Sequence, residues 1–395
     1  MESYRGTEIA REKQGQAFPL LREQGIDLWL LLTREGSDPA VPLLAGGTTV
    51  GAAAFLLNAD GSSTAIVANY DRGHVERLGT FDRVVAYDLG LEDALGRELA
   101  ARDPGCIAIN YSESDHLCDG LSLGQYRWLE RLLARLGFKG RLVSSEPALA
   151  VIRSVKSPSE LERLEKAVTA TCHVYDRVTG MLKPGMSEIE VSRLFLQVIE
   201  ALGLESGSDD FGGGPIVMIV REGVAHRQPT GAVIKPGDIL LVDMSVKYQH
   251  YVSDVARTLY FLRPGESHAP ETIESAFRVV HRAISEAAAA LRPGVKGYEV
   301  DAVARRVLTT SGYQEMSHAL GHQIGRSTHD GGTTLAPRWE RYGQAPYGTV
   351  RAGEVYTLEP TIIQPEISIL TEEDVVVTEW GVRWLSRRQE ELICR

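Results

Sequence analysis

The run "LLVDMSVKYQHYVSDVARTLYF", residues 240–261, is strand-like but contains two aspartates, Asp243 and Asp254. Aspartate is depleted in strands, and a buried carboxylate is costly unless its charge is compensated. If the run folds as a hairpin centred between Tyr248 and Gln249, the two aspartates lie opposite each other. Their Cβ atoms would then be about 4.5–5.5 Å apart, where like charges destabilise the pair. A bound cation would remove this repulsion.

A second pair of acids occurs in "VYTLEPTIIQPEISILTEEDVVVTEWG", residues 355–381. A hairpin centred between Pro365 and Glu366 places Glu359 opposite Glu372. Two such hairpins facing each other would present four carboxylates, whose charge two divalent cations would balance. Oxygen ligands of this kind favour Mn²⁺, Mg²⁺ or Ca²⁺.

Three histidines lie between the two acidic runs. His318, His322 and His329 fall within the segment "EMSHALGHQIGRSTHDGG". One imidazole among carboxylate ligands widens the choice of metal towards Zn²⁺, Co²⁺ or Fe²⁺. Any one of these residues alone would most often be an ordinary polar loop residue. Paired acids in two hairpins with a histidine cluster between them form a pattern that packing does not require, and the set therefore predicts a metal site.

The acidic hairpins belong to a region that repeats itself. The segments "LKPGMSEIEV" (182–191) and "LRPGVKGYEV" (291–300) match at an offset of 109 residues. Each follows a long amphipathic stretch, and each precedes another helical pattern and then strands. The matching order of elements indicates a duplicated, pseudo-twofold domain in which each half supplies one pair of acids.

The N-terminal part of the chain has a different pattern. A buried strand at 26–32, strands at 52–58 and 64–70 and a helix at 126–137 predict an α/β domain over residues 1–150. The following "SPSELERLEKAV" contains a Ser-Pro helix start, which marks the beginning of a second domain over residues 151–395. The fold class expected for the whole chain is therefore α/β.

Composition excludes several classes of partner. The formal net charge is −11 and basic residues are mixed with acids, so we expect no nucleic-acid partner. The N-terminus has no apolar segment of the signal-peptide type and no run is long enough to span a membrane, which predicts no membrane partner and a cytoplasmic location. Four scattered cysteines indicate neither a disulfide framework nor a thiolate metal site.

These motifs together resemble the pita-bread metallopeptidases, the family of methionine aminopeptidase, aminopeptidase P and prolidase. The resemblance implies five metal ligands, which are Asp243, Asp254, His322, Glu359 and Glu372. It implies two divalent ions per subunit, with Mn²⁺ first and Co²⁺ or Zn²⁺ as alternatives. It also implies that residues 1–150 form a creatinase/prolidase-type N-terminal domain, that residues 151–395 form the pita-bread catalytic domain, and that the protein is a homodimer.

The resemblance also assigns roles around the metals. Asp254 and Glu372 would bridge the two ions, and Glu359 would act as general base. Three further histidines match the proline-specific members of the family and would face the scissile amide: His226, His318 and His329. The expected substrate is a small peptide with proline in the second position.

One departure from the family pattern affects substrate choice. Proline-specific members usually carry an arginine where this chain has Leu370, so we expect another guanidinium to contact the substrate carboxylate. Arg326 is the first candidate, and Arg338 and Arg341 are nearby in sequence. The leading hypothesis is an Xaa-Pro dipeptidase. The alternatives are an Xaa-Pro aminopeptidase acting on longer peptides, a metal-free creatinase-like hydrolase, against which the retained ligands argue, and a non-catalytic binding protein.

Overall fold

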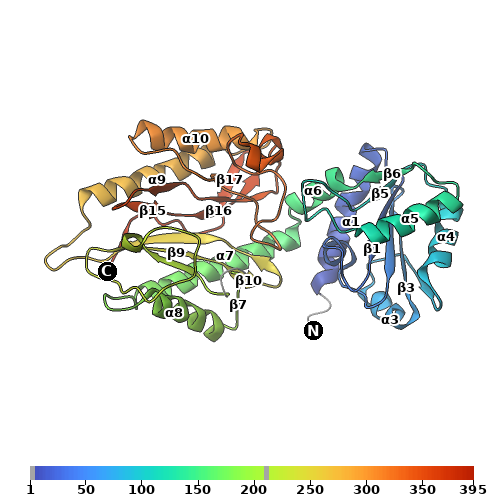
Figure 1. Cartoon of the computed structure of the whole chain (residues 1–395), viewed down its shortest axis with the longest axis horizontal. Helices are drawn as coiled ribbons and strands as arrows, with labels where there is room; N and C mark the ends of the chain where they lie inside the picture. The colour runs from blue at the N-terminus through green and yellow to red at the C-terminus, as the bar shows by residue number, and fades with distance from the viewer. Residues whose placement is uncertain (1–4, 209–212) are drawn as a thin grey trace. The chain divides into compact units, whose positions relative to one another are not determined.

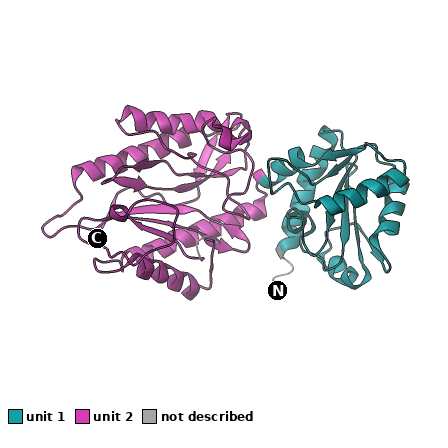
Figure 2. Ribbon diagram, in the orientation of Figure 1, with its two compact units in different colours: residues 1–153 teal, residues 154–395 magenta. Residues whose placement is uncertain are grey.

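The computed structural model describes residues 5–208 and 213–395 (Figure 1). The chain forms two compact units, residues 1–153 and 154–395 (Figure 2). None of the helices in the described ranges is long and apolar enough to cross a membrane. All four cysteines are free thiols.

The first unit is built on a six-stranded sheet with the strand order β4-β3-β2-β1-β5-β6. Strand β1 pairs antiparallel with β2 and parallel with β5. The four interior strands are buried along their whole length, and strands covered on both faces are expected to read as continuous apolar runs. The strands are β1 (Leu28–Thr33), β2 (Ala53–Asn58), β3 (Ser63–Ala68), β4 (Arg83–Tyr87), β5 (Ile107–Ile109) and β6 (Leu142–Ser144).

Helices cover this sheet. Residues of α4 and α5 share one hydrophobic core with alternate residues of β1, among them Leu30 and Leu32. Helix α5 begins with a capping box in which Ser122 and Gln125 satisfy each other's backbone N–H groups. The helices of this part are α1 (Arg5–Glu23), α2 (Val41–Ala45), α3 (Asn69–Leu78), α4 (Leu91–Arg102), α5 (Leu123–Arg135) and α6 (Glu146–Ser154).

The second unit has the duplicated order of elements that the repeat predicted. Helices α7 (Pro158–Thr179) and α8 (Glu188–Ala201) correspond to α9 (Glu271–Ala290) and α10 (Gly297–Thr310). The connecting turns adopt the same conformation, since Gly185 has φ 97° and Gly294 has φ 94°. Only glycine adopts such a conformation without strain, which explains the shared Pro-Gly of the repeat. The two helix pairs lie on opposite sides of a central layer of strands (Figure 1).

Within residues 154–208 and 213–395, twelve strands make up that layer. The first half contributes β7 (Glu205–Ser206), β8 (Ile216–Ile219), β9 (Ile239–Met244), β10 (Val246–Tyr248), β11 (Tyr251–Val252) and β12 (Val255–Tyr260). The second half contributes β13 (Val355–Leu358), β14 (Thr361–Ile363), β15 (Ser368–Leu370), β16 (Glu373–Thr378), β17 (Gly381–Trp384) and β18 (Ile393–Cys394). Short 3₁₀ turns at Val220–Glu222, Glu340–Tyr342 and Ala345–Tyr347 complete the unit.

The register of the first acidic hairpin differs from the prediction. Asp243 pairs with Ala256, not with Asp254, because the two-residue turn is Gln249-His250. Both turn residues have positive φ, 48° and 71°. Such turns usually carry Asn-Gly, so this sequence gave no signal for its position. The partner of Asp243 is therefore two residues further along the opposite strand than predicted. Because side chains alternate with a period of two, both aspartates remain on the same face of the hairpin.

The second hairpin has the predicted register. Leu358 pairs with Glu373 and Thr361 pairs with Leu370, which brackets Glu359 and Glu372 in opposed positions.

Candidate metal centre

The acids and the central histidine converge in the second unit. One carboxylate oxygen of Asp254, one of Glu372 and a ring nitrogen of His322 all lie within 4.8 Å of one another. The Nε2 atom of His322 is 3.6 Å from Asp254 Oδ2 and 3.6 Å from Glu359 Oε1. Asp243 completes the group, because its charge acts directly on both Asp254 and Glu359.

Strand alternation explains why these side chains meet. Leu240 and Val242 of β9 pack in the core of α7 and α8, whereas Leu241 packs in the core of α9 and α10. Asp243 therefore points, like Leu241, away from α7 and α8 and towards the second half. In that half, Leu358 packs in the core of α9 and α10, and the next residue, Glu359, faces the acids of the first hairpin.

The position of His322 depends on a close approach of two chain segments. A Cβ added to Gly321 would lie 2.0 Å from the carbonyl oxygen of Thr357, so only glycine fits. The approach allows the Thr357 N–H to donate to the His322 carbonyl at 2.9 Å. His322 Nδ1 lies 3.3 Å from the Gln323 carbonyl oxygen, which assigns the ring proton to Nδ1. The Nε2 lone pair is thereby left facing the acids.

The electrostatics of this cluster are those of a cation site. Burial raises the pKa of Asp243 to about 6. Burial, and then neighbouring carboxylates, raise the pKa of Asp254, Glu359 and Glu372 well above the ordinary range. Burial lowers the pKa of His322 to about 3, so the ring is neutral and cannot offset the acids. Four carboxylates, of which Asp254 and Glu372 are buried and Asp243 and Glu359 partly buried, form with one neutral imidazole a donor set that fits divalent ions such as Mn²⁺, Co²⁺ or Zn²⁺.

Residues that the sequence did not single out hold the ligands in place. The hydroxyl of Tyr175 in α7 shares its one hydrogen between the carbonyl oxygens of Val242 and Val255, at 2.9 and 2.8 Å, which ties β9 to β12 beside the two aspartates. Arg257 donates to the Glu372 carbonyl at 2.9 Å. These contacts join residues 67 to 115 positions apart, and no local motif predicts them.

Asp374 lies directly behind the cluster. The backbone N–H of Asp254 donates to its Oδ2 at 3.1 Å. Its carboxyl group is completely buried, and burial raises its pKa well above the ordinary range. The only sequence signal for this residue is the acidic run "EED" that follows Thr371.

The other three histidines of the prediction surround the cluster. The His329 ring lies over that of His322, with centroids 4.2 Å apart and an interplanar angle of 43°. His318 is hydrogen-bonded at both nitrogens, to the Ala319 carbonyl at 2.7 Å and to Thr361 Oγ1 at 2.6 Å. Burial first, and then the charges of Arg305, His226 and Arg341, lower the pKa of His318. The charge of His226 also acts on Asp243, so His226 lies near both.

The arginines are distributed differently. The Arg326 guanidinium lies 5.8 Å from the centroid of the Tyr251 ring, beside the tip of the first hairpin. Arg338 lies over the Tyr298 ring, at 4.9 Å. Arg341 donates to the Ser317 carbonyl and lies over the Trp339 ring at 4.7 Å. Arg341 lies near a histidine of the cluster, because its charge acts on His318.

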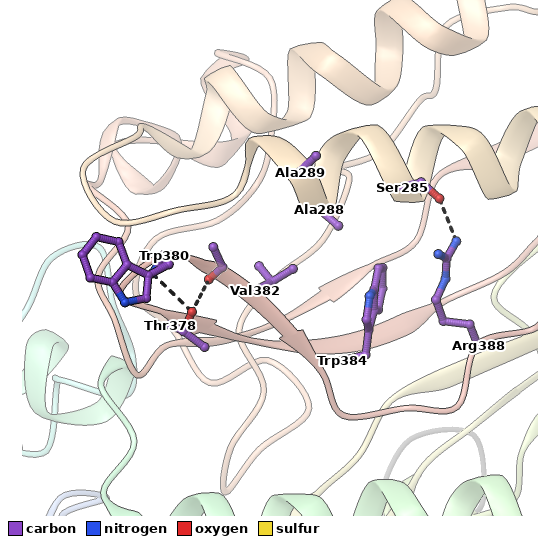
Figure 3. A pocket seen from close by; sticks show the side chains of 9 residues that line it. Ser285, Ala288, Ala289, Thr378, Trp380, Val382, Trp384 and Arg388 are labelled. Atoms are coloured by element: carbon purple, nitrogen blue, oxygen red, sulfur yellow. Dashed lines mark hydrogen bonds between the residues drawn. The ribbon is translucent and has the colours of Figure 1, made fainter.

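A separate groove of about 480 Å³ lies on the outer side of the second half. Figure 3 shows it between α9 and the strands β16 and β17, with Val382 and Trp384 along its floor. Trp380 lies at one end and is 95% exposed. None of the predicted site residues lines this groove, so it is not the candidate active site.

Comparisons with known sequences agree with this geometry. Residues 162–379 match the sequence model of metallopeptidase family M24. The Xaa-Pro dipeptidase of Pyrococcus horikoshii is 27% identical over 271 residues, which cover 68% of this chain and 72% of that protein. The Xaa-Pro dipeptidase of Pyrococcus furiosus is 27% identical over 245 residues, which cover 61% of this chain and 66% of that protein.

Solved structures show the same fold. The Xaa-Pro dipeptidase of Bacillus anthracis aligns with a TM-score of 0.76 and 23% identity, covering 98% of this chain and all of that one. The X-Pro aminopeptidase of Thermotoga maritima aligns with a TM-score of 0.75 and 22% identity, covering 94% of this chain and 98% of that one. The predicted α/β class with a pita-bread fold is therefore confirmed.

Proposed function

Because the chain belongs to metallopeptidase family M24, we propose that it hydrolyses the peptide bond before proline, acting as an Xaa-Pro dipeptidase with two divalent ions per subunit. The observation that carries this proposal is the convergence of Asp254, His322 and Glu372, with Asp243 and Glu359 beside them, in one buried cluster. The Xaa-Pro dipeptidases among the relatives supply the choice of bond.

The family resemblance supplies the ligand roles. Asp254 and Glu372 would be shared by the two ions and Asp243 and His322 would each hold one, and all four side chains belong to the cluster. The ions, when bound, supply Lewis-acid activation of a water molecule and of the scissile carbonyl. Mn²⁺ is our first choice, with Co²⁺ or Zn²⁺ as alternatives.

Glu359 is the residue we assign to proton transfer. Burial and the charge of Asp243 raise its pKa in the metal-free protein, and its carboxylate faces the centre of the cluster, where it could take up a proton. It would accept a proton from the attacking water and return it to the proline nitrogen as the amide bond breaks. The same carboxylate can serve both steps because it faces His322 at the centre of the cluster.

The three non-ligand histidines would act on the substrate. Burial lowers the pKa of His318, and its Nδ1–H is donated to the Ala319 carbonyl oxygen, so Nε2, which is paired with Thr361 Oγ1, is the ring atom that would face the substrate as an acceptor. His226 and His329 lie near the cluster on separate loops and would contact the substrate from other sides. Their roles in binding and catalysis are a proposal that substitution of each histidine by glutamine would test.

Dipeptidase action needs a positive group for the free carboxylate of the substrate. Arg326 was the first candidate, and its position beside Tyr251 allows it to serve if the substrate extends towards the tip of the first hairpin. Arg341, beside His318, is the second candidate. If neither contacts the carboxylate, the alternative is an Xaa-Pro aminopeptidase, the activity named for the Thermotoga maritima structure.

A panel of peptides tests the proposal. The wild-type protein loaded with Mn²⁺ should hydrolyse Ala-Pro and should not hydrolyse Ala-Ala or Pro-Ala. Hydrolysis of Ala-Pro-Ala but not of Ala-Pro would favour the aminopeptidase. The homodimer that the resemblance implies is a separate proposal, which light scattering would test.

A further inference from the structure

Each of the three non-ligand histidines is on a loop that an ion pair with a buried acid ties to the scaffold. We propose that these pairs, Glu188–Arg227, Asp301–Arg305 and Lys156–Asp330, are positioning residues that set the rings of His226, His318 and His329 towards the substrate. The inference rests on the proposed function only for the role of the histidines, since the contacts themselves are structural.

The first pair holds the loop of His226. Arg227, the next residue, donates to both oxygens of Glu188 at 2.7 and 2.8 Å. Glu188 is the first residue of α8 and is fully buried. It also accepts from the N–H and the hydroxyl of Thr230, at 2.8 and 2.7 Å. Glu188 also accepts from the N–H of Ile219 at 2.8 Å, so one carboxylate binds the chain both before and after His226, whose own side chain is exposed.

The second pair holds the loop of His318. Arg305 donates to Asp301 at 2.6 Å, both on α10. The same guanidinium donates to the Met316 carbonyl at 2.6 Å and to the His318 carbonyl. Asp301 in turn accepts from the N–H of Leu320 at 3.1 Å, so the pair is hydrogen-bonded to the loop both before and after the histidine.

The third pair holds the loop of His329. Lys156, which precedes the N-cap of α7, donates to the carboxylate of Asp330 at 2.8 Å, and both side chains are buried. The Asp330 N–H donates to the Gln323 carbonyl at 2.9 Å. Asp330 follows His329 and Gln323 follows His322, so this contact fixes the two rings relative to each other.

The distribution of these pairs argues for positioning. A buried ion pair contributes little net stability, because desolvation offsets its Coulomb attraction. In the described part of the second unit, pairs such as Arg263–Glu266 and Arg387–Asp176, which lie next to none of these histidines, are exposed. Both partners are buried in Asp301–Arg305, in Lys156–Asp330 and in Arg257–Glu373, which adjoins the ligand Glu372, whereas Arg227 is partly exposed and its partner Glu188 is buried.

Duplication does not explain the pattern. Helices α8 and α10 are equivalent in the repeat, but the position of Glu188 corresponds to Gly297, and Asp301 lies further along its helix. In each half, an acid on the second helix binds an arginine and a loop that carries a histidine. The two acids are at different positions along their helices. A need to position the histidine in both loops accounts for this better than duplication of a single acid–arginine contact.

The test uses the first pair, because it has the most hydrogen bonds to its loop. The variant Arg227→Met removes the guanidinium but leaves a buried carboxylate unpaired, which can prevent folding. The double variant Glu188→Gln/Arg227→Met removes both charges, and Arg227→Lys retains the charge. Arg263→Met, which breaks an exposed pair, is the matched control.

Three quantities are measured on the full-length chain: metal content, kinetics with Ala-Pro and the His226 ring signal in the metal-free protein. The ring signal is a ¹H–¹³C NMR cross-peak, assigned by its loss in His226→Gln. We expect the double variant to keep its metal, to lose kcat by about 10²-fold, as for a displaced catalytic group, and to shift or split the His226 cross-peak. Arg227→Lys should recover part of kcat, and Arg263→Met should match the wild type.

An unchanged His226 cross-peak in the folded double variant would overturn the inference, whatever its activity. A shifted cross-peak with kcat within about twofold of the wild type would also overturn it, because position would then not matter for turnover. Absence of Ala-Pro hydrolysis by the metal-loaded wild type would instead refute the proposed function, and the NMR comparison would still decide whether the pair positions His226.

Discussion

The imidazole of His322 and the carboxylate of Glu359 face each other with Nε2 and Oε1 3.6 Å apart. Burial keeps the imidazole neutral and raises the pKa of the carboxyl group. The two groups therefore gain little from each other as an ion pair. A cation between them would satisfy both, which is why this contact supports a metal centre.

The charge on the cluster predicts an effect of pH on stability. Asp254 has a pKa well above its ordinary value because of burial and the charges of Asp243 and Asp374. Such a group binds more protons in the folded than in the unfolded state, so its contribution to the free energy of unfolding falls as pH rises. We expect Asp254→Asn to raise the Tm of the metal-free protein at about pH 7.5, by roughly 2–4 °C for each ~1 kcal/mol gained.

This gain should disappear as the pH falls towards the ordinary range of carboxyl groups, where the wild-type Asp254 is also neutral. Thermal unfolding of both proteins at several pH values, with chelator present, measures it. With saturating Mn²⁺ the sign should reverse, because the variant loses a ligand. A lower Tm for metal-free Asp254→Asn at neutral pH would show that the acids do not repel one another.

The proton-transfer role of Glu359 predicts a loss of turnover. Glu359→Gln preserves the shape of the side chain but cannot accept a proton, and loss of a general base costs about 10²–10⁴-fold in kcat. The fold should be retained, which circular dichroism would confirm. Glu366→Gln, an exposed change at the tip of the same hairpin, is the control. Retention of most of kcat by Glu359→Gln would mean that another residue is the base.

Substrates with a free and with an amidated C-terminus can show which of the candidate arginines contacts the substrate carboxylate. A charge-assisted hydrogen bond to the substrate carboxylate is worth about 1.5–3 kcal/mol, or roughly 10–100-fold in KM. We expect Arg326→Ala, at the first candidate, to raise KM for Ala-Pro far more than for Ala-Pro-amide. Arg341→Ala should do so less, and Arg338→Ala should have no selective effect.

Equal effects of every arginine substitution on the free and amidated substrates would contradict this assignment. The carboxylate would then have no guanidinium partner among the three, and action on longer peptides would become the better account.

Much of the site was predictable from sequence because its signals are local. The spacing of Asp243 and Asp254, the acids of the second hairpin and the segment around His322 each lie within a short run. The pairing register of the first hairpin was not predictable, since Gln249-His250 is an unusual pair for a turn with two positive φ values. The predicted register was wrong by two residues, which leaves each aspartate on the predicted face of the hairpin. The predicted metal site is therefore unaffected.

The supporting contacts could not be read from the sequence. Tyr175 reaches β9 and β12 across 67 and 80 residues, and Lys156 reaches Asp330 across 174. Each residue is unremarkable in its own segment, and its role follows only from tertiary packing. The same holds for the arginines. The sequence shows that Arg326, Arg338 and Arg341 are in one segment, but it does not show on which side of the cluster each side chain lies.

The central claim is that this cluster binds two divalent ions and uses them to cleave Ala-Pro. Its most direct test is a titration of the metal-free protein with Mn²⁺ in which bound metal and Ala-Pro hydrolysis are measured in the same samples. The account predicts no hydrolysis without metal and a rise in rate that saturates at two ions per chain. Full hydrolysis by protein shown to be metal-free, or saturation with metal and no hydrolysis of any Xaa-Pro peptide, would contradict it.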